Sequence, residues 1–255
     1  MNRLDKIKSI REKLASGLPS IGSWIQIPHP SIAEIMGNSG YDWVAVDIEH
    51  GSICTHQLPD LFRALELGDT LPLVRLSEGT DRECKQSLDA GAGGVIVPMI
   101  ESASQLESVR DACRWPPAGK RGVGFSRANL FGKNFDQYTV EAQSPLLVAM
   151  IENIKAVDNL DDILEVNGLD AVFIGPYDLS ASMGLTANFT APDFLAVINR
   201  IRESCDKHNI ASGIHVVMPD KKELGSRIEE GYRFIAYSID SVFLIESAQY
   251  ENTGN

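Results

Sequence analysis

Asp170-Ala-Val-Phe-Ile-Gly-Pro-Tyr-Asp-Leu-Ser180 combines a buried strand with a sharp turn into a helix. Its apolar run is bounded by charge on one side and by Gly-Pro on the other, which is typical of a strand buried on both faces. Gly175 and Pro176 end the strand, and Asp178 follows where it can cap the next helix and lie at the strand's C-terminal end. Taken alone, this stretch gives Asp178 the role of a helix cap.

A second stretch, Pro145-Leu-Leu-Val-Ala-Met-Ile-Glu-Asn153, has the same buried pattern and ends in the carboxylate Glu152. Two consecutive parallel strands bring their C-terminal ends to the same edge of a sheet. One carboxylate from each strand can hold a divalent cation there and leave its other side open to water and substrate, so that the ion acts as a Lewis acid. The pair Glu152 and Asp178 therefore predicts an open metal site.

The composition excludes several classes of protein. The chain has 255 residues, of which 44% are hydrophobic, so it can bury a substantial core. Its formal charge of -12 argues against a nucleic-acid binder and against a protein that binds anionic membranes, because both need a basic face. No apolar run approaches the roughly 20 residues of a membrane span, and residues 1–13 lack the apolar core of a signal peptide. We expect one cytoplasmic domain over residues 1–255.

The four cysteines point to the same compartment. They are scattered, with no Cys-x-x-Cys pair and no histidine at zinc-finger spacing. We expect ordinary thiols in a reducing environment. The cysteines are Cys54, Cys84, Cys113 and Cys205.

The rest of the chain alternates between apolar strand patterns and amphipathic helix patterns, after a helix at the N-terminus. Eight strand–helix units in a chain of this length predict a (β/α)8 TIM barrel, whose chemistry lies at the C-terminal ends of the strands. The expected strands are 21–27, 43–50, 71–76, 94–100, 146–151, 170–175, 212–217 and 233–238. The expected helices are 31–38, 57–67, 81–90, 103–113, 155–165, 192–208, 220–230 and one that starts at Ser241.

Residues 115–144 interrupt this alternation. The segment is rich in Gly, Asn and aromatic residues and is too long for an ordinary connection between elements. We predict an irregular insertion that has a function or forms an interface.

Charged side chains gather at the predicted C-terminal ends of the strands. A metal, a guanidinium and an imidazole together suit chemistry on a 2-oxo acid: an enolate forms at C3, the metal and Arg75 stabilise its oxygen, and His50 moves protons. Simpler roles are a satisfied loop histidine for His50 and a structural ion pair with Asp47 or Glu49 for Arg75. The set comprises Asp47, Glu49, His50, Arg75, Glu152 and Asp178.

Two other kinds of aldolase site do not fit. None of the eight expected strands contains a lysine for a Schiff base, and Lys155, just beyond the fifth strand, is better explained as a solvated helix residue. The loops after the last two strands, which begin at Val217 and Ser238, lack the Gly-rich sequence that grips phosphate, which disfavours phosphorylated substrates.

Several linked motifs resemble the metal-dependent, class II pyruvate aldolases of the HpcH/HpaI family, which includes 4-hydroxy-2-oxoheptanedioate and 2-dehydro-3-deoxyglucarate aldolases. The match runs in order from about residue 20 to about residue 250. It rests on Tyr41-Asp-Trp-Val-Ala-Val-Asp-Ile-Glu-His50, Pro98-Met99, Trp115-Pro-Pro117 with Arg121-Gly-Val-Gly124, Ile151-Glu152 and Phe173-Ile-Gly-Pro-Tyr-Asp-Leu-Ser180.

The resemblance implies roles for the charged residues. It places a divalent ion, Mg²⁺ or Mn²⁺ with Co²⁺ and Zn²⁺ as alternatives, on Glu152 and Asp178, with pyruvate chelated to it. Arg75 would contact the keto oxygen, with Gly175 and Pro176 lining the substrate site. The family pairs its histidine, here His50, with an aspartate that matches Asp89, and Asp47 matches an acidic residue near the metal-bound waters. The family also forms hexamers in which the last helix packs on a neighbouring barrel.

Two positions depart from the family pattern. Tyr177 stands where relatives usually have a small residue, so it would narrow the pocket or add a hydroxyl beside the pyruvate carboxylate. Met150 stands where several relatives have Gln. Both put the substrate in question, and Lys120 and Arg121 of the insertion are candidates to meet an acidic aldehyde.

The leading hypothesis is a metal-dependent aldolase that reversibly cleaves a 4-hydroxy-2-oxo acid to pyruvate and an aldehyde through a metal-bound enolate. One alternative is a citrate-synthase-like or acyl-CoA-lyase-like carbon–carbon enzyme of the same superfamily. Another is a non-catalytic barrel that binds a carboxylate ligand.

Overall fold

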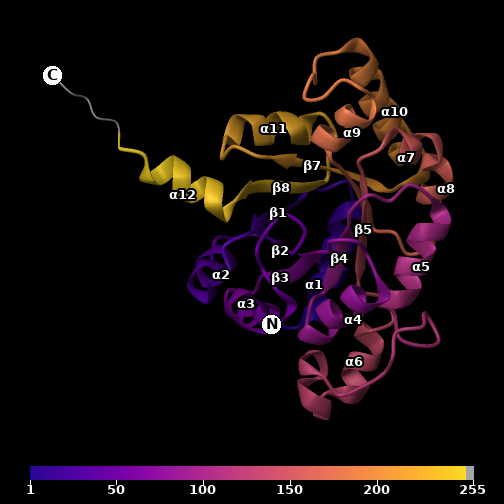
Figure 1. Ribbon diagram of the computed structural model, residues 1–255. Coiled ribbons are helices and arrows are strands. Elements are labelled where there is room, and N and C mark those ends of the chain that lie inside the picture. Colours follow the sequence, from indigo (N-terminus) through magenta and orange to yellow (C-terminus); the bar gives the residue numbers. More distant parts are fainter. Residues whose placement is uncertain (251–255) are drawn as a thin grey trace.

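A computed structural model describes residues 1–250 as a barrel of eight parallel strands, which pair in chain order and close between β8 and β1 (Figure 1). This confirms the predicted (β/α)8 architecture. Every strand is close to its expected position, with differences of at most three residues at either end, and β5 has the expected bounds. The strands are β1 (Ser20–Ile25), β2 (Trp43–Asp47), β3 (Leu71–Arg75), β4 (Gly94–Val97), β5 (Leu146–Ile151), β6 (Ala171–Ile174), β7 (Ala211–Val216) and β8 (Phe234–Ile239).

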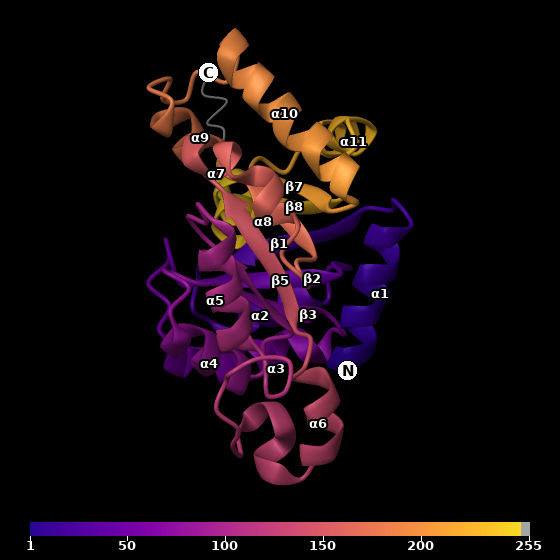
Figure 2. The ribbon, with the colours of Figure 1, turned by 90° about the vertical axis from the view of Figure 1, so that its right-hand side faces the viewer.

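Helices follow the strands around the outside of the barrel (Figures 1 and 2). They are α1 (Arg3–Ala15), α2 (Pro30–Gly37), η1 (Thr55–Gln57), α3 (Leu58–Leu67), α4 (Asp81–Ala90), α5 (Ala103–Cys113), η2 (Arg127–Gly132), α6 (Phe135–Glu141), α7 (Ile154–Asp158), α8 (Leu160–Leu164), α9 (Pro176–Ser182), α10 (Pro192–His208), α11 (Lys221–Glu229) and α12 (Asp240–Ala248). Within residues 1–250, no helix is both long and apolar enough to cross a bilayer.

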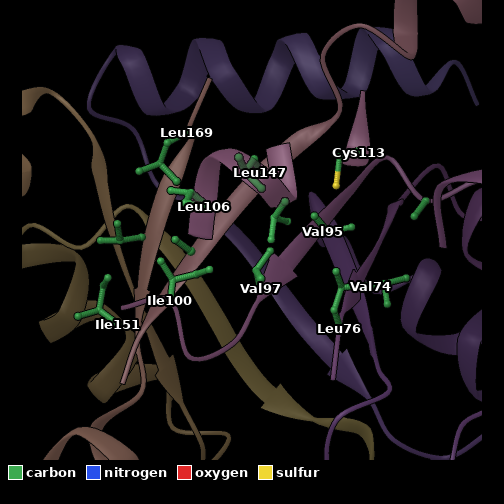
Figure 3. Packing of buried hydrophobic residues seen from close by; sticks show 14 of the residues in the cluster. Val74, Leu76, Val95, Val97, Ile100, Leu106, Cys113, Leu147, Ile151 and Leu169 are labelled. Carbon is green, nitrogen blue, oxygen red and sulfur yellow. The ribbon is translucent and has the colours of Figure 1, made fainter. Parts of the chain in front are cut away.

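The strands bury both of their faces, which explains their unbroken apolar sequences. Side chains that point into the barrel form one core, where Trp43 stacks on Phe234 with ring centroids 4.3 Å apart. Gly22 makes room for this stack, because a Cβ at that position would lie 2.1 Å from the Trp43 ring. The alternate side chains form a larger core between strands and helices; Figure 3 shows its part around β3, β4 and β5, which includes Val97 and Leu106.

One end of the barrel is closed by the N-terminal helix. Ile7 and Ile10 of α1 belong to the interior core, so α1 covers the end where the strands begin. The other end, where the strands finish, carries α9 and is left for the functional site. The parallel register sets side chains next to one another there, since Asp47 of β2 pairs with Arg75 of β3.

The insertion at 115–144 is more ordered than predicted. It contains η2 and α6 and has a small core of its own, in which Trp115 meets Tyr138 edge to face at 5.1 Å. It lies at the end of the barrel opposite α9 and α10 (Figure 2). Arg3 of α1 joins it to the barrel through ion pairs with Glu141 at 2.7 Å and Glu66 at 3.2 Å.

Two helix predictions need correction. The helix expected at 155–165 is divided into α7 and α8, with Asn159 between them. The expected cap at Asp178 is wrong, because Gly175 is the N-cap of α9 and Asp178 lies inside its first turn. Proline favours the first position of a helix, so Pro176 starts α9 two residues earlier than a capping aspartate would.

Candidate active site

Asp47 is the centre of a hydrogen-bond network at the C-terminal end of the barrel. Its side chain is fully buried, and one oxygen accepts from the backbone N–H groups of Glu49 and His50 at 3.1 and 3.2 Å. Arg75 donates to both oxygens, at 2.9 and 2.5 Å, and Gln26 donates to Oδ2 at 2.9 Å. Burial alone would raise the pKa of Asp47, but these donors outweigh it and hold the pKa below its ordinary value. Asp47 therefore remains an anion that fixes Arg75 and the turn after β2.

Arg75 is held from three directions. Asp47 binds its Nε and Nη2 edge, and Glu49 lies 3.4 Å from Nε. The guanidinium lies over the Trp24 ring, with Cζ 4.7 Å from the ring centroid, a cation–π geometry. The predicted ion pair with Asp47 and Glu49 is thus present. Since one edge of the guanidinium is committed to Asp47, the remaining N–H groups are the ones free to meet a ligand.

Glu152 projects from the C-terminal end of β5 and is almost entirely buried. One carboxylate oxygen, Oε2, accepts the Met99 backbone N–H at 3.0 Å. The other oxygen lies against Gly175, where a Cβ would approach it to 2.4 Å. Burial raises the pKa of Glu152 to about 7, with the nearby charges of Glu49 and Asp178 adding to the effect.

Glu49 is a third carboxylate at the same place. Burial raises its pKa to about 6, and the charges of Asp47 and Asp178 act in the same direction against that of Arg75. Its Oε2 is buried and accepts no hydrogen bond. A buried carboxylate oxygen without a hydrogen bond is costly, and the Arg75 guanidinium, with Nε 3.4 Å away, offsets part of that cost.

Asp178 completes the acidic group from the first turn of α9, where its side chain is exposed. The donor set of Glu152, Asp178 and nearby Glu49 is made of oxygen alone, which suits a hard divalent cation. Within residues 1–250 no group of three or more His, Cys, Asp and Glu side chains is already arranged around one metal position. The residues fit an ion that takes two protein ligands and fills its other positions with water and substrate.

His50 lies at the rim of this group. Its side chain is 59% exposed, and its Nε2 is 3.8 Å from Glu49 Oε2. Asp89 is elsewhere, in the last turn of α4 and five residues before β4 begins, at the N-terminal end of the barrel. There it accepts from Arg121 at 3.4 Å. The structure does not bring His50 and Asp89 together within one chain.

The two departures from the family pattern lie in different surroundings. Met150 of β5 is buried in the barrel interior and precedes Glu152 by two residues. Tyr177 is exposed, and its ring meets that of Phe189 edge to face, with the ring centroids 5.0 Å apart. Pro176, between Gly175 and Tyr177, is half-buried at the same rim.

The basic residues of the insertion do not reach this site within the chain. Lys120 pairs with Asp111 of α5 at 2.8 Å. Arg121 is buried between Trp115 and Tyr138, 5.7 Å from each ring centroid. Both lie with the insertion, so one chain alone offers no support for their predicted contact with an acidic aldehyde.

Sequence reasoning missed the residues that orient Arg75 from β1. Trp24 lies beneath the guanidinium, and Gln26 binds Asp47 from just beyond the strand end. The Met99 N–H that holds Glu152 was also missed; Met99 has a φ of 51°, an uncommon conformation for a non-glycine residue. The only signal in the sequence was that Trp24 and Gln26 are two residues apart, so that their side chains lie on the same face of a strand. This spacing does not identify the partners of either side chain.

Comparison with known proteins gives the family. Residues 20–247 match HpcH/HpaI aldolase/citrate lyase. The chain belongs to this family. The HpcH/HpaI assignment confirms the resemblance seen in the motifs. The matched segment contains all eight strands.

Relatives in the HpcH/HpaI family match nearly the full chain. A hydroxypyruvate/pyruvate aldolase from Roseobacter denitrificans is 37% identical over 247 residues, or 95% of each protein. A 4-hydroxy-2-oxovalerate aldolase from Novosphingobium aromaticivorans is 35% identical over 249 residues, covering 95% of this chain and 92% of that protein. The crystal structure of a family member from Burkholderia cenocepacia J2315 superposes with a TM-score of 0.88 at 29% identity, over 94% of this chain and 96% of the other.

Proposed function

We propose that this protein is a metal-dependent pyruvate aldolase, a carbon–carbon lyase that reversibly cleaves a 4-hydroxy-2-oxo acid to pyruvate and an aldehyde. The strongest support is the convergence of Glu152, Asp178 and Arg75 at the C-terminal end of a barrel, the end where barrel enzymes carry their chemistry. The names of the relatives from Roseobacter denitrificans and Novosphingobium aromaticivorans point to the same reaction class.

Glu152 and Asp178 are the proposed ligands of a divalent ion, Mg²⁺ or Mn²⁺. When bound, such an ion acts as a Lewis acid that polarises the oxygens of a 2-oxo acid. The buried Glu49 oxygen, which accepts no hydrogen bond, and the raised pKa of Glu152 support a cation here, because its charge would stabilise both anions. Gly175 keeps the Glu152 carboxylate in place, since any side chain there would push it away.

Arg75 and His50 are the proposed groups that act on the substrate. The Arg75 edge not bound to Asp47 donates to the keto oxygen of pyruvate, where negative charge grows as a C3 proton leaves. Asp47 and Trp24 hold that edge still, so little reorganisation is needed. His50 is exposed at the rim and its imidazole is suited to carry protons between the substrate and solvent.

The rival activities receive less support. An open pair of oxygen donors beside a fixed guanidinium would also serve a citrate-synthase-like or acyl-CoA-lyase-like enzyme. Relatives of 35–37% identity over at least 95% of this chain carry aldolase names, which favours an aldehyde as the second product. A barrel that only binds carboxylates would not need the exposed His50 beside them.

We further propose that the protein works as an oligomer, a hexamer by family resemblance, in the cytoplasm. The helix α12 projects from the barrel with Leu244 and Ile245 exposed (Figure 1), and α11 contributes no buried residue, which supports packing against another copy. His50 and Asp89 then pair only if they come from different copies. The four cysteines are free thiols, in keeping with a reducing compartment.

Exchange of the pyruvate C3 protons in D₂O tests the first half-reaction without any knowledge of the aldehyde. We expect exchange with Mg²⁺ or Mn²⁺ and none after EDTA treatment. In the Glu152→Gln and Asp178→Asn variants the exchange rate should fall by at least 100-fold, since a removed ligand weakens the site that polarises the substrate. Proton NMR of the pyruvate methyl group measures the rate.

A matched control is Glu107→Gln, which changes an exposed carboxylate on α5 and should exchange at the wild-type rate. Exchange that persists at full rate in EDTA would remove the metal from the proposal. Wild-type exchange in Glu152→Gln and Asp178→Asn would remove these two residues as its ligands. No exchange with any divalent ion would favour the citrate-synthase-like or binding-only alternatives.

A further inference from the structure

His215 of β7 points into the barrel at the level of the candidate metal ligand Glu152. In the row of paired residues below them, Phe173 of β6 pairs with Met150 of β5 and with Gly213 of β7. Side chains alternate between the two faces of a strand, so a residue two positions further on returns to the same face. Glu152 follows Met150 by two residues, and His215 follows Gly213 by two. Both side chains therefore face the interior at the same level.

The surroundings of the His215 ring belong to the candidate active site. The strand between Glu152 and His215 places no side chain there, because the corresponding residue is Gly175. The His215 ring centroid lies 6.0 Å from that of Trp24, which belongs to the interior core. On the same indole lies the Arg75 guanidinium, with Cζ 4.7 Å from the ring centroid. The imidazole thus borders the space that Glu152 and Arg75 also face.

A β-bulge on β8 brings a carbonyl oxygen to this ring. Between Ala236 and Ile239, β8 has one residue more than the stretch of β1 with which it pairs. Ser238, within this bulge, has a φ of 55°, which non-glycine residues rarely adopt. Its carbonyl oxygen accepts from Nε2 of His215 at 3.2 Å and from the hydroxyl of Ser23 at 3.1 Å. Bulges and strained residues are concentrated at functional sites, so the bulge indicates that the orientation of this imidazole matters.

The hydrogen bond to Ser238 also fixes the tautomer of His215. A carbonyl oxygen only accepts, so Nε2 carries the hydrogen and Nδ1 has a free lone pair. Burial lowers the pKa of His215 to about 4, so the ring is neutral at pH 7 and Nδ1 remains an acceptor. Within residues 1–250 no donor is bonded to Nδ1, and Nδ1 is not one of the fully buried polar atoms that lack a partner. It is therefore open to a donor that arrives with a ligand.

The free lone pair suits a ligand with a hydroxyl group. Ionised pyruvate has acceptor oxygens and a methyl group but no hydrogen-bond donor, so it cannot use Nδ1. A hydroxyl group can donate to it. In the proposed reaction such a hydroxyl has two sources, C3 of the 2-oxo acid or C2 of the aldehyde. Arg75 does not distinguish hydroxylated from deoxy substrates, because its proposed contact is the keto oxygen, which both possess.

We propose that His215 determines specificity: its Nδ1 accepts a hydrogen bond from a hydroxyl group of the substrate and so favours hydroxylated substrates over their deoxy analogues. The inference rests on the proposed aldolase function and adds to it a residue of β7 that binds substrate. The hydroxyl keeps its proton throughout, so His215 contributes binding and takes no part in bond making or breaking.

Two pairs of substrates test the proposal on the metal-loaded enzyme. The first compares C3 proton exchange of hydroxypyruvate and pyruvate in D₂O, after subtraction of the rate without enzyme. The second compares glycolaldehyde and acetaldehyde as acceptors for pyruvate. For each pair, the ratio of kcat/KM for the hydroxylated compound to that for the deoxy compound is measured in wild type and in His215→Leu. At least one ratio should fall about fivefold or more in His215→Leu, because the bound hydroxyl loses its acceptor.

The variants separate the acceptor from the packing of the ring. Leucine keeps an apolar side chain in the barrel, and Ser23 still donates to the Ser238 carbonyl oxygen in that variant. His215→Asn retains an acceptor oxygen near the position of Nδ1 and should keep the affected ratio within about threefold of wild type. The control His208→Leu removes an imidazole on α10, outside the barrel, and should leave both ratios unchanged. Taking ratios within each variant cancels any general loss of activity.

The outcomes identify the source of the hydroxyl. A fall in the first ratio alone would place it on C3 of the 2-oxo acid, and a fall in the second alone would place it on the aldehyde. Unchanged ratios in His215→Leu with normal pyruvate exchange would overturn the role of His215 and leave the aldolase proposal intact. Equal falls in His215→Leu and His215→Asn would overturn it as well. Absent metal-dependent exchange in the wild type would overturn the aldolase function and this inference with it.

Discussion

Arg75 lies over Trp24, with its Cζ 4.7 Å from the ring centroid, while Asp47 binds the edge of the same guanidinium. The indole comes from β1, the carboxylate from β2 and the guanidinium from β3, so three consecutive strands define one orientation. Asp47 is in turn fixed by Gln26 and by two backbone N–H groups. A guanidinium held in this way presents a fixed donor edge to the open end of the barrel.

Replacing Arg75 by Lys should lower the rate of pyruvate C3 exchange by at least 100-fold, or about 3 kcal/mol of transition-state stabilisation. An ammonium cannot bind Asp47 with two parallel N–H groups and also direct a further donor at the substrate. The comparison variant is Arg110→Lys on α5, whose ion pairs with Asp111 and Glu107 lie outside the barrel mouth. A loss of only a few-fold in Arg75→Lys would reduce the residue to a structural ion pair.

Trp24 should affect catalysis more than an equally buried tryptophan without a cation. Trp24→Leu and Trp43→Leu both remove an interior indole, and both should destabilise the fold by roughly 2 to 4 kcal/mol. Trp43 stacks on Phe234 and carries no guanidinium. We therefore expect about a tenfold drop in kcat for Trp24→Leu, from the lost cation–π contact, and less than threefold for Trp43→Leu.

Urea denaturation and C3 exchange measured on the same preparations separate the two effects. Trp24→Phe retains an aromatic face and should recover most of kcat. Equal losses of kcat in Trp24→Leu and Trp43→Leu at equal losses of stability would show that Trp24 acts through the core and not through Arg75.

The barrel and much of its mouth could be predicted because both follow from strand sequences. Buried parallel strands have continuous apolar runs, so all eight were recognisable, and polar residues just after them had to meet at one end. Asp47 and Arg75 end neighbouring strands in register, which is why their ion pair could be expected. These relationships depend on chain order and strand direction alone.

The remaining details depend on contacts that strand patterns do not specify. The sequence of the first strand gave no reason to pair Trp24 with Arg75. The Gly-Pro sequence indicated a turn, yet the first turn of α9 begins at Pro176 and takes Asp178 inside the helix. The pairing of Asp89 with His50 was predicted from family resemblance alone. In the structure Asp89 lies on α4, whereas His50 follows the C-terminal end of β2.

Gly175→Ala should weaken the divalent site while leaving the fold intact. A Cβ at this position would lie 2.4 Å from Glu152 Oε1, so the carboxylate must move. Displacing a ligand that is normally fixed by its surroundings costs about 10- to 100-fold in metal affinity. Gly124→Ala is the control, because a Cβ there meets nothing within 4 Å. Titration of C3 exchange with Mn²⁺ gives the apparent affinities, and equal values in the two variants would contradict the role of Gly175.

The metal-free protein should lose stability as the pH rises from about 4.5 to 7. Burial raises the pKa of Glu152 to about 7, so the folded state retains a proton that the unfolded state releases at lower pH. The stability from this group is present below pH 4.5 and disappears through pH 7, a change of about 3 kcal/mol. Relative to wild type in EDTA, Glu152→Gln should therefore become more stable by about 2 kcal/mol between pH 5 and pH 8.

Mg²⁺ or Mn²⁺ should raise the free energy of unfolding of the wild type at pH 8, and should do so much less at pH 5, where Glu152 is protonated. In Glu152→Gln, the added metal ion should change the free energy of unfolding only weakly at both pH values. Parallel curves for wild type and Glu152→Gln in EDTA would mean that Glu152 does not carry a proton in the folded state.

His215 should make the free energy of unfolding fall as the pH is lowered below about 6.5, the opposite pH dependence to that of Glu152. Burial lowers its pKa to about 4, and its Nε2 lies 3.2 Å from the Ser238 carbonyl oxygen. Below pH 6.5 the unfolded state gains a proton that the folded state cannot take, so stability falls from about pH 6.5 down to pH 4. From pH 7 to pH 5 the loss due to this group is about 2 kcal/mol. His215→Gln should remove that loss from urea denaturation curves, whereas His208→Gln, on α10 outside the barrel, should retain it. If His215→Gln kept the full acid-side slope, the imidazole would have to be accessible to protons in the folded barrel.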